Sequence, residues 1–113
     1  MTATFLLKNG VGVVVVAGEL TSASIDSFRD QFMAWWQSQP ELRNVVVDLT
    51  GVDLLDSSGL GALVALLKRV SERGGDLKIA GLQKKVRMVF EITRAFKVFD
   101  IFDQADEALQ ACE

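Results

Sequence analysis

Apolar residues in the first third of the chain follow two different spacings. Residues 4–8 and 13–17 are short, largely apolar strand candidates on either side of the Asn-Gly pair at 9–10, a combination typical of a β-hairpin. Residues 25–36 instead carry apolar side chains at helical intervals, and the preceding segment, 21–24, is rich in helix-capping residues. We therefore predict a hairpin followed by a helix.

The predicted helix has one apolar face, which consists of Ile25, Phe28, Phe32, Trp35 and Trp36. Successive residues on a helix point about 100° apart, so the two tryptophans cannot both face the core fully. We expect one of them to be partly exposed at the rim of the core. Pro40 then ends the helix in a loop.

The middle of the chain alternates again between strand and helix. The β-branched run at 45–47 is typical of a parallel strand covered on both faces. A helix then follows, and it stops at Gly74-Gly75. Its expected apolar stripe consists of Leu60, Leu63, Val64, Leu67 and Val70.

The last third continues the same alternation. Residues 77–80 and 98–102 are predicted strands, the second a short edge strand, and 86–90 and 105–112 belong to predicted helices. Strands separated by helices of this kind favour parallel crossovers. We predict an α/β fold in one domain, residues 1–113. Its sheet has four to five strands, mostly parallel but mixed, with an N-terminal hairpin and about four helices.

Charge and hydropathy then narrow the class of protein. The chain has 113 residues and a net charge of −3, which argues against non-specific binding to nucleic acid. The longest apolar stretches, 13–17 and 60–67, fall far short of the ~20 residues of a membrane helix. The first residues do not resemble a secretory signal. We expect a cytoplasmic protein that does not associate with a membrane.

The absence of histidine lowers the expectation of catalysis. It removes the usual general base, the commonest metal ligand and any Ser-His-Asp triad. Cys112 is the only cysteine, so an intrachain disulfide and a cysteine-rich metal site are excluded. We expect no enzyme activity, no cofactor and no metal.

The segment Asp56-Ser57-Ser58-Gly59-Leu60-Gly61 joins the predicted strand at 45–49 to the helix that follows. Functional groups in α/β sheets gather at such strand-to-helix turns. It lacks the phosphate-loop, dinucleotide-binding and hydrolase-elbow patterns. From the local sequence alone, helix capping is the favoured role for the serine and aspartate side chains. Modification of an exposed hydroxyl, or docking of a partner, is the functional alternative.

The same segment, together with Val45-Val46-Val47-Asp48-Leu49 before it, resembles the signature of the anti-sigma factor antagonists, a family of STAS domains. Gly18-Glu19-Leu20 and the run from Val86 to Phe102 match further family elements. The family often has Asp where this chain has Thr21, and Thr-Gly-Leu where it has 93–96. These departures leave the serine segment unchanged.

The resemblance implies a partner-switching cycle. The unphosphorylated protein would bind an anti-sigma factor that is also a serine kinase, and phosphorylation of Ser57 would release it. A phosphatase would reset the switch. Asp56, Ser58, Gly59, Leu60 and Gly61 would form the partner-binding loop, in a monomer or weak dimer.

Two alternatives remain open at this point. One is a non-phosphorylated STAS scaffold or accessory subunit, stressosome-like or transporter-linked, in which Ser57 is only a cap. The other is nucleotide binding by the loop end of the sheet, which the missing phosphate loop disfavours. Local physical chemistry accepts either Ser57 or Ser58 as the modified residue.

Overall fold

The computed structural model describes residues 1–112. Ten elements follow one another along the chain: β1 (Thr2–Lys8), β2 (Val11–Leu20), α1 (Ile25–Ser38), β3 (Val45–Leu55), α2 (Ser57–Glu72), β4 (Leu77–Ala80), α3 (Lys84–Ile92), the 3₁₀ turn η1 (Ala95–Lys97), β5 (Asp100–Phe102) and α4 (Ala105–Ala111). None of the helices in residues 1–112 combines the length and hydrophobicity needed to cross a membrane.

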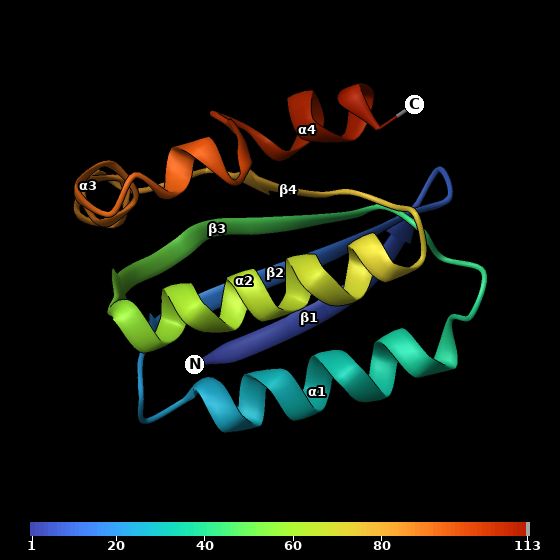
Figure 1. Cartoon of the computed structure of the whole chain (residues 1–113), viewed down its shortest axis with the longest axis horizontal. Helices are drawn as coiled ribbons and strands as arrows, with labels where there is room; N and C mark the ends of the chain where they lie inside the picture. Colours follow the sequence, from blue (N-terminus) through green and yellow to red (C-terminus); the bar gives the residue numbers. More distant parts are fainter. Residues whose placement is uncertain (113) are drawn as a thin grey trace.

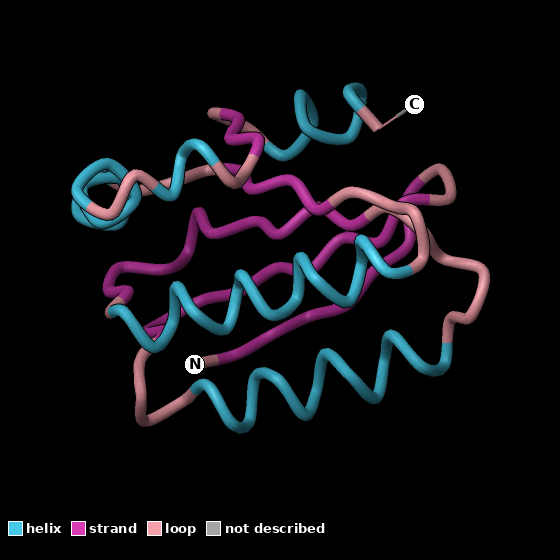
Figure 2. Tube along the Cα trace, viewed as in Figure 1, coloured by secondary structure: helices cyan, strands magenta, loops and turns pink. Residues whose placement is uncertain are grey.

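The strands form one mixed sheet in the order β1-β2-β3-β4-β5, seen in magenta in Figure 2. β1 pairs with β2 antiparallel, through the hairpin turn at Asn9 and Gly10, which both have positive φ. The other three pairings are parallel. The predicted α/β fold, with a five-stranded mixed sheet, an N-terminal hairpin and four helices, is confirmed.

Helices cover both faces of this sheet (Figure 1). α1 and α2 lie side by side on one face and run in the same direction, with their N-terminal ends together. Their buried side chains, with Val86 and Phe90 of α3, join the main core. α4 lies on the other face, where Ala108 and Leu109 pack in a smaller core against β2, β3 and β4. The apolar periodicity of each helix thus faces the sheet.

β3 is longer than the apolar run that predicted it. It pairs with β4 only from Val45 to Asp48, and continues along β2 to Leu55 through two irregularities in register. Such irregularities bend a strand and increase its twist. The extension places the end of β3 beside Leu20, the last residue of β2, so that α2 starts at the same edge of the sheet.

The buried face of α2 is rotated from the predicted stripe. Leu63 and Val70 are buried as expected, but Leu60, Val64 and Leu67 are only partly buried. The fully covered positions also include Ala62 and Leu66. A small alanine lets the helix lie close to the sheet, and the larger side chains beside it are left at the rim.

The expectation for the tryptophan pair is confirmed. Trp36 is buried and stacks on Phe32, with 5.8 Å between ring centroids. Trp35 is partly buried and packs against Phe5 of β1, with 5.1 Å between the ring centroids. The second tryptophan therefore closes the rim between α1 and the edge strand.

The edge strand predicted at 98–102 is shorter than expected. Only Asp100 to Phe102 pair with β4. Val98 is exposed after the 3₁₀ turn, and Phe99 is buried against Phe90, with ring centroids 5.9 Å apart. The aromatic contact fixes Phe99 before the strand begins, which explains the late start.

Candidate functional site

Asp56 occupies the N-cap position of α2, directly after β3. Its Oδ1 accepts a hydrogen bond from the backbone N–H of Gly59 at 2.9 Å. A carboxylate there satisfies one of the free N–H groups of the first helical turn and faces the positive end of the helix dipole. The sequence Asp-Ser-Ser-Gly therefore forms this turn because the aspartate stabilises the start of the helix.

The second carboxylate oxygen reaches a different loop. Asp56 Oδ2 accepts a hydrogen bond from the backbone N–H of Ser22, at 3.1 Å, in the connection between β2 and α1. The backbone N–H of Asp56 also points to the carbonyl oxygen of Leu20, at 3.4 Å. One side chain thus joins two loops, and the site consists of both.

These hydrogen bonds keep Asp56 ionised. The bond from Gly59, followed by the bond from Ser22, holds the pKa of the carboxyl group below its ordinary value of 3.8, against the opposing effect of partial burial. The turn therefore carries a fixed negative charge next to Ser57 at neutral pH.

The two serines of the turn differ in exposure. Ser57 is exposed and Ser58 is only partly so. The hydroxyl group of Ser57 has no hydrogen-bond partner among residues 1–112. The capping role expected from the sequence is therefore correct for Asp56 and wrong for Ser57. A hydroxyl that caps nothing is free to meet a protein or reagent from solution.

The glycines have unequal roles. Gly59 is buried, and a Cβ at this position would collide with the carbonyl oxygen of Leu20. The absence of a side chain lets α2 start against the end of β2. Gly61 is exposed, with open space where a Cβ would lie. Leu60, between them, is partly buried against the main core.

The chemistry available at this turn is limited. In the described part of the chain, no group of three Asp, Glu or Cys side chains is placed to bind a metal ion. The one carboxylate beside Ser57 is occupied by the two backbone N–H groups, and its low pKa makes it a weak base. The arrangement can present a hydroxyl group and a negative charge to a partner, but it does not activate the serine.

The segment 21–24 also belongs to the site, although its local pattern does not indicate this. Its residue types predict only a cap for α1. Ser24 is indeed the N-cap residue, but its hydroxyl donates to the carbonyl oxygen of Glu19 at 2.8 Å and makes no capping bond. Ser22 and Asp56 are 34 residues apart. No local pattern pairs residues at that separation, so only the fold reveals their contact.

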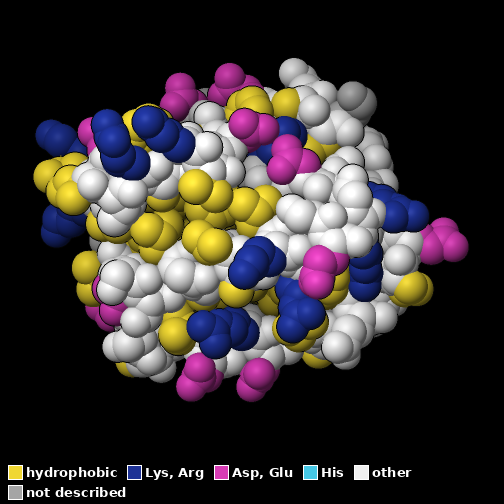
Figure 3. Space-filling model, in the orientation of Figure 1, with side chains coloured by type: hydrophobic (Ala, Val, Ile, Leu, Met, Phe, Trp, Pro, Cys, Tyr) yellow, Lys and Arg dark blue, Asp and Glu magenta, His cyan; other side chains and the backbone are white. Residues whose placement is uncertain are grey.

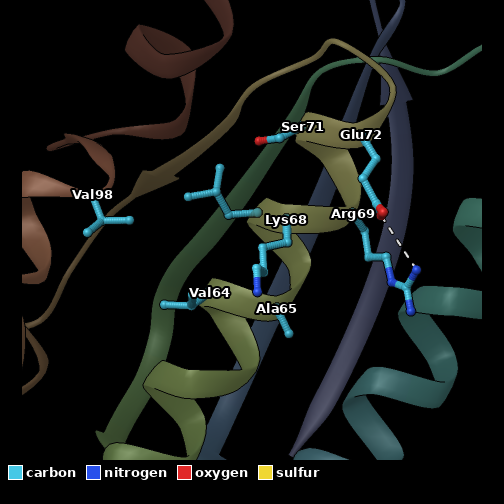
Figure 4. A pocket seen from close by; sticks show the side chains of 8 residues that line it. Val64, Ala65, Lys68, Arg69, Ser71, Glu72 and Val98 are labelled. Carbon is cyan, nitrogen blue, oxygen red and sulfur yellow. Dashed lines mark hydrogen bonds and ion pairs between the residues drawn. The ribbon is translucent and has the colours of Figure 1, made fainter.

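A second feature escaped the sequence pattern: a groove between α2 and the residues after η1. It is open, has a volume of about 750 Å³ and is lined by Val64, Ala65, Leu67, Lys68, Arg69, Ser71, Glu72 and Val98. Figure 4 shows Val64 and Ser71 directed toward Val98, while Arg69 turns away and pairs with Glu72. The half-buried leucine and valine of the α2 stripe form its floor.

Comparison with known proteins places this geometry in a family. The STAS domain model matches residues 5–108. The anti-sigma F factor antagonist of Paenibacillus polymyxa is 28% identical over 92% of this chain and 88% of its own length. The anti-sigma-B factor antagonist of Bacillus subtilis is 30% identical over 86% of each chain.

The solved structures agree. The crystal structure of an anti-sigma factor antagonist from Mycobacterium paratuberculosis superposes with a TM-score of 0.87 at 25% identity, over 98% of this chain and 92% of that one. The relatives are named for opposing another protein rather than for a reaction, in line with the expected non-enzymatic regulator. The chain belongs to the STAS domain family, and within it to the anti-sigma factor antagonists.

Proposed function

We propose that this protein binds an anti-sigma factor through the turn around Ser57 and is released when that partner, acting as a serine kinase, phosphorylates Ser57. The observation that carries the proposal is the exposed hydroxyl group of Ser57 at the first residue of α2, with no hydrogen-bond partner among residues 1–112. Binding of the unphosphorylated form frees the sigma factor, and a phosphatase restores that form.

The difference in exposure favours Ser57 over Ser58 as the phosphorylated residue. In the transfer, the Ser57 hydroxyl oxygen attacks the γ-phosphorus of ATP, loses its proton to the kinase, and ADP leaves. A kinase must reach the hydroxyl group from outside, and Ser57 is the exposed member of the pair. Asp56 and Gly59, which flank the serines, fix the turn in position for this approach.

Electrostatics supports release by phosphorylation. A phosphate adds about −1.5 to −2 charge beside a carboxylate that is already ionised. Within the protein, the positive end of the helix dipole stabilises this added charge by roughly 0.3–1 kcal/mol at an exposed site. A partner packed on the same turn must desolvate that charge or face it, at a cost of several kcal/mol, and each ~1.4 kcal/mol lowers affinity tenfold.

The proposed partner surface includes both loops joined by Asp56. It consists of Asp56, Ser57, Ser58, Gly59, Leu60 and Gly61, and the adjoining residues of the segment 21–24. Leu60 contributes an apolar side chain and the two serines contribute polar contacts, a mixture typical of transient interfaces.

The test combines phosphosite mapping with binding. The protein, Ser57→Ala and Ser58→Ala are each incubated with ATP and an anti-sigma factor kinase of the same organism, and mass spectrometry locates the phosphate. We expect modification of the wild type and Ser58→Ala at position 57 only. Phosphate on Ser58 of the wild type would refute the assignment.

Binding of the same partner is then measured by calorimetry. Ser57→Ala should bind with the affinity of the unphosphorylated wild type and stay bound in the presence of ATP. Ser57→Asp should bind at least tenfold more weakly. Equal affinity for both variants would instead support the alternative, a non-phosphorylated scaffold or accessory STAS subunit.

A further inference from the structure

The cationic residues of this acidic protein are concentrated in two segments that border the Val98 groove, as we call the hollow between α2 and Val98. Residues 57–72 and 84–98 carry seven of the twelve Lys and Arg residues but only two of the fifteen Asp and Glu residues. Their net charge is therefore +5, against −8 for the rest of the chain. The charged residues in the lining itself are Lys68, Arg69 and Glu72, so the groove is positive in an acidic protein, which favours an anionic partner.

The groove itself is apolar at its floor. Val64 and Leu67 on α2 are partly buried, and Val98 opposite them is 56% exposed. Figure 3 shows hydrophobic side chains gathered in the middle of this face, with Lys and Arg side chains on either side of them. Apolar surface rimmed by charge is typical of an interaction site.

Two cations, one in the lining of the groove and one next to it in the chain, have no opposing charge among residues 1–112. Lys68 lines the groove from α2 and makes no ion pair with any residue from 1 to 112. Lys97, exposed and directly before Val98, is likewise unpaired in the described chain. The carboxylate of Glu72, also in the lining, is already neutralised by Arg69 at 3.5 Å.

We propose that the Val98 groove binds an acidic amphipathic helix of a second protein, independently of the phosphorylation state of Ser57. The apolar stripe of the helix would lie on Val64, Leu67 and Val98, and its flanking carboxylates would face Lys68 in the lining and reach the exposed Lys97 that precedes Val98. Nucleic acid would gain nothing from this apolar floor, and a flat bilayer would not enter a groove.

Distance separates the groove from the phosphorylation site. At 1.5 Å per helical residue, Val64 lies about 10 Å and Ser71 about 21 Å along α2 from Ser57. A charge at Ser57 is screened over about 8 Å at physiological ionic strength. A helix in the groove and an anti-sigma factor at the Ser57 turn are therefore two separate contacts, and the groove does not depend on the function proposed above.

The test uses two synthetic 18-residue amphipathic peptides with the same leucine stripe, one flanked by glutamates and the other by lysines. Binding to the intact protein is followed by fluorescence anisotropy, and the contact is located from backbone amide NMR shifts. We expect the glutamate peptide to bind at least tenfold more tightly and to shift the amides of Val64, Leu67 and Val98. Lys68→Glu with Lys97→Glu should reverse that preference.

Two further variants keep the outcome decisive. Val98→Ser removes apolar floor at an exposed position and should weaken the glutamate peptide at least fivefold, whereas Ser57→Asp should leave its affinity unchanged. Equal binding of both peptides, shifts confined to other surfaces, or loss of affinity in Ser57→Asp would overturn the proposal. The proposal would also be overturned if the protein bound anionic phosphatidylglycerol vesicles or duplex DNA and did not bind the glutamate peptide. Thermal melts verify that each variant is folded.

Discussion

The carboxylate of Asp56 joins the start of α2 to the backbone N–H of Ser22, which lies 34 residues earlier in the chain, by a hydrogen bond of 3.1 Å. The other oxygen of the same carboxylate caps Gly59. A local helix cap and a tertiary contact thus depend on one side chain. The geometry of the turn that presents Ser57 depends on both bonds.

Two substitutions of Asp56 separate these roles. Asparagine retains one acceptor oxygen for Gly59, but its NH₂ group cannot accept the bond from Ser22. Alanine loses both bonds. We expect a lower urea midpoint for Asp56→Ala than for Asp56→Asn, with faster hydrogen exchange of the Ser22 amide in both. An unchanged Ser22 exchange rate in Asp56→Asn would contradict the bridging role.

Stability should depend on pH through the same carboxyl group. Its pKa is lower in the folded protein than the ordinary value of 3.8, so its contribution is present above that value and is lost as the pH falls through the folded pKa. We expect the difference in free energy of unfolding between wild type and Asp56→Asn to shrink as the pH falls below 3.8 and through the lower folded pKa. Urea titrations across this range measure it, and a constant difference would exclude the linkage.

Gly59 and Gly61 offer a matched pair of alanine substitutions. At Gly59 a Cβ meets the backbone of Leu20, which cannot move without shifting β2, so Gly59→Ala should cost about 1–3 kcal/mol. At Gly61 the space is open, so Gly61→Ala should stabilise the helix by about 0.4–1 kcal/mol. Urea unfolding measures both changes in the free energy of unfolding. Changes of the same sign in the two variants would contradict this prediction.

Arg73 secures the opposite end of α2. Its guanidinium donates to the carbonyl oxygens of Gln39 at 2.8 Å, Trp36 at 3.0 Å and Leu42 at 3.2 Å, and lies 3.7 Å from the centroid of the Trp36 ring. Arg73→Met keeps most of the apolar stem but leaves these carbonyl groups without a charged donor. We expect a loss of about 2–3 kcal/mol.

Lysine is the control at Arg73. It keeps the charge but lacks the planar group that reaches several carbonyl oxygens and stacks on the indole ring, so Arg73→Lys should recover less than half of the loss. Chemical denaturation followed by tryptophan fluorescence measures both variants. Wild-type stability in Arg73→Lys would mean that charge alone matters.

A negative charge at Ser57 should separate binding from folding. The residue is exposed in the first turn of α2, where an acidic side chain is favoured by the helix dipole but lies close to the Asp56 carboxylate. We expect Ser57→Asp to change the free energy of unfolding by less than about 1 kcal/mol. A much larger loss would attribute reduced partner affinity to unfolding, and Ser57→Asn serves as the uncharged control.

Local patterns predicted the elements well where one physical cause dominates. The strand at Leu77–Ala80 and the helix end before Gly74 follow directly from an apolar run and a glycine stop. The start of β3 at Val45 was also predicted, but its extension to Leu55 was not. That second half pairs with β2 through two shifts in register, so its buried side chains, Leu49, Val52 and Leu55, fall at intervals of three residues instead of alternating, and the usual strand period does not mark it.

The site shows the same division. The turn at 56–61 was recognised from its own residues, since an aspartate before a helix has a clear local role. The distinction between Ser57 and Ser58 required knowledge of which side faces solvent. The spacing of Val64 and Leu67 matches a core stripe equally well, so no local pattern reveals the Val98 groove. Exposure depends on how close α2 lies to the sheet, which the small Ala62 allows.

α1 and α2 are fastened to each other at both ends, by Asp56 at their beginning and by Arg73 at their finish. Contacts at both ends keep the two helices from sliding along each other and from separating. We therefore expect the backbone around Ser57 to keep its shape whether or not a phosphate is present. The partner would meet a new charge on a surface of unchanged shape, so its preference for the unphosphorylated form would reside in the partner's own surface.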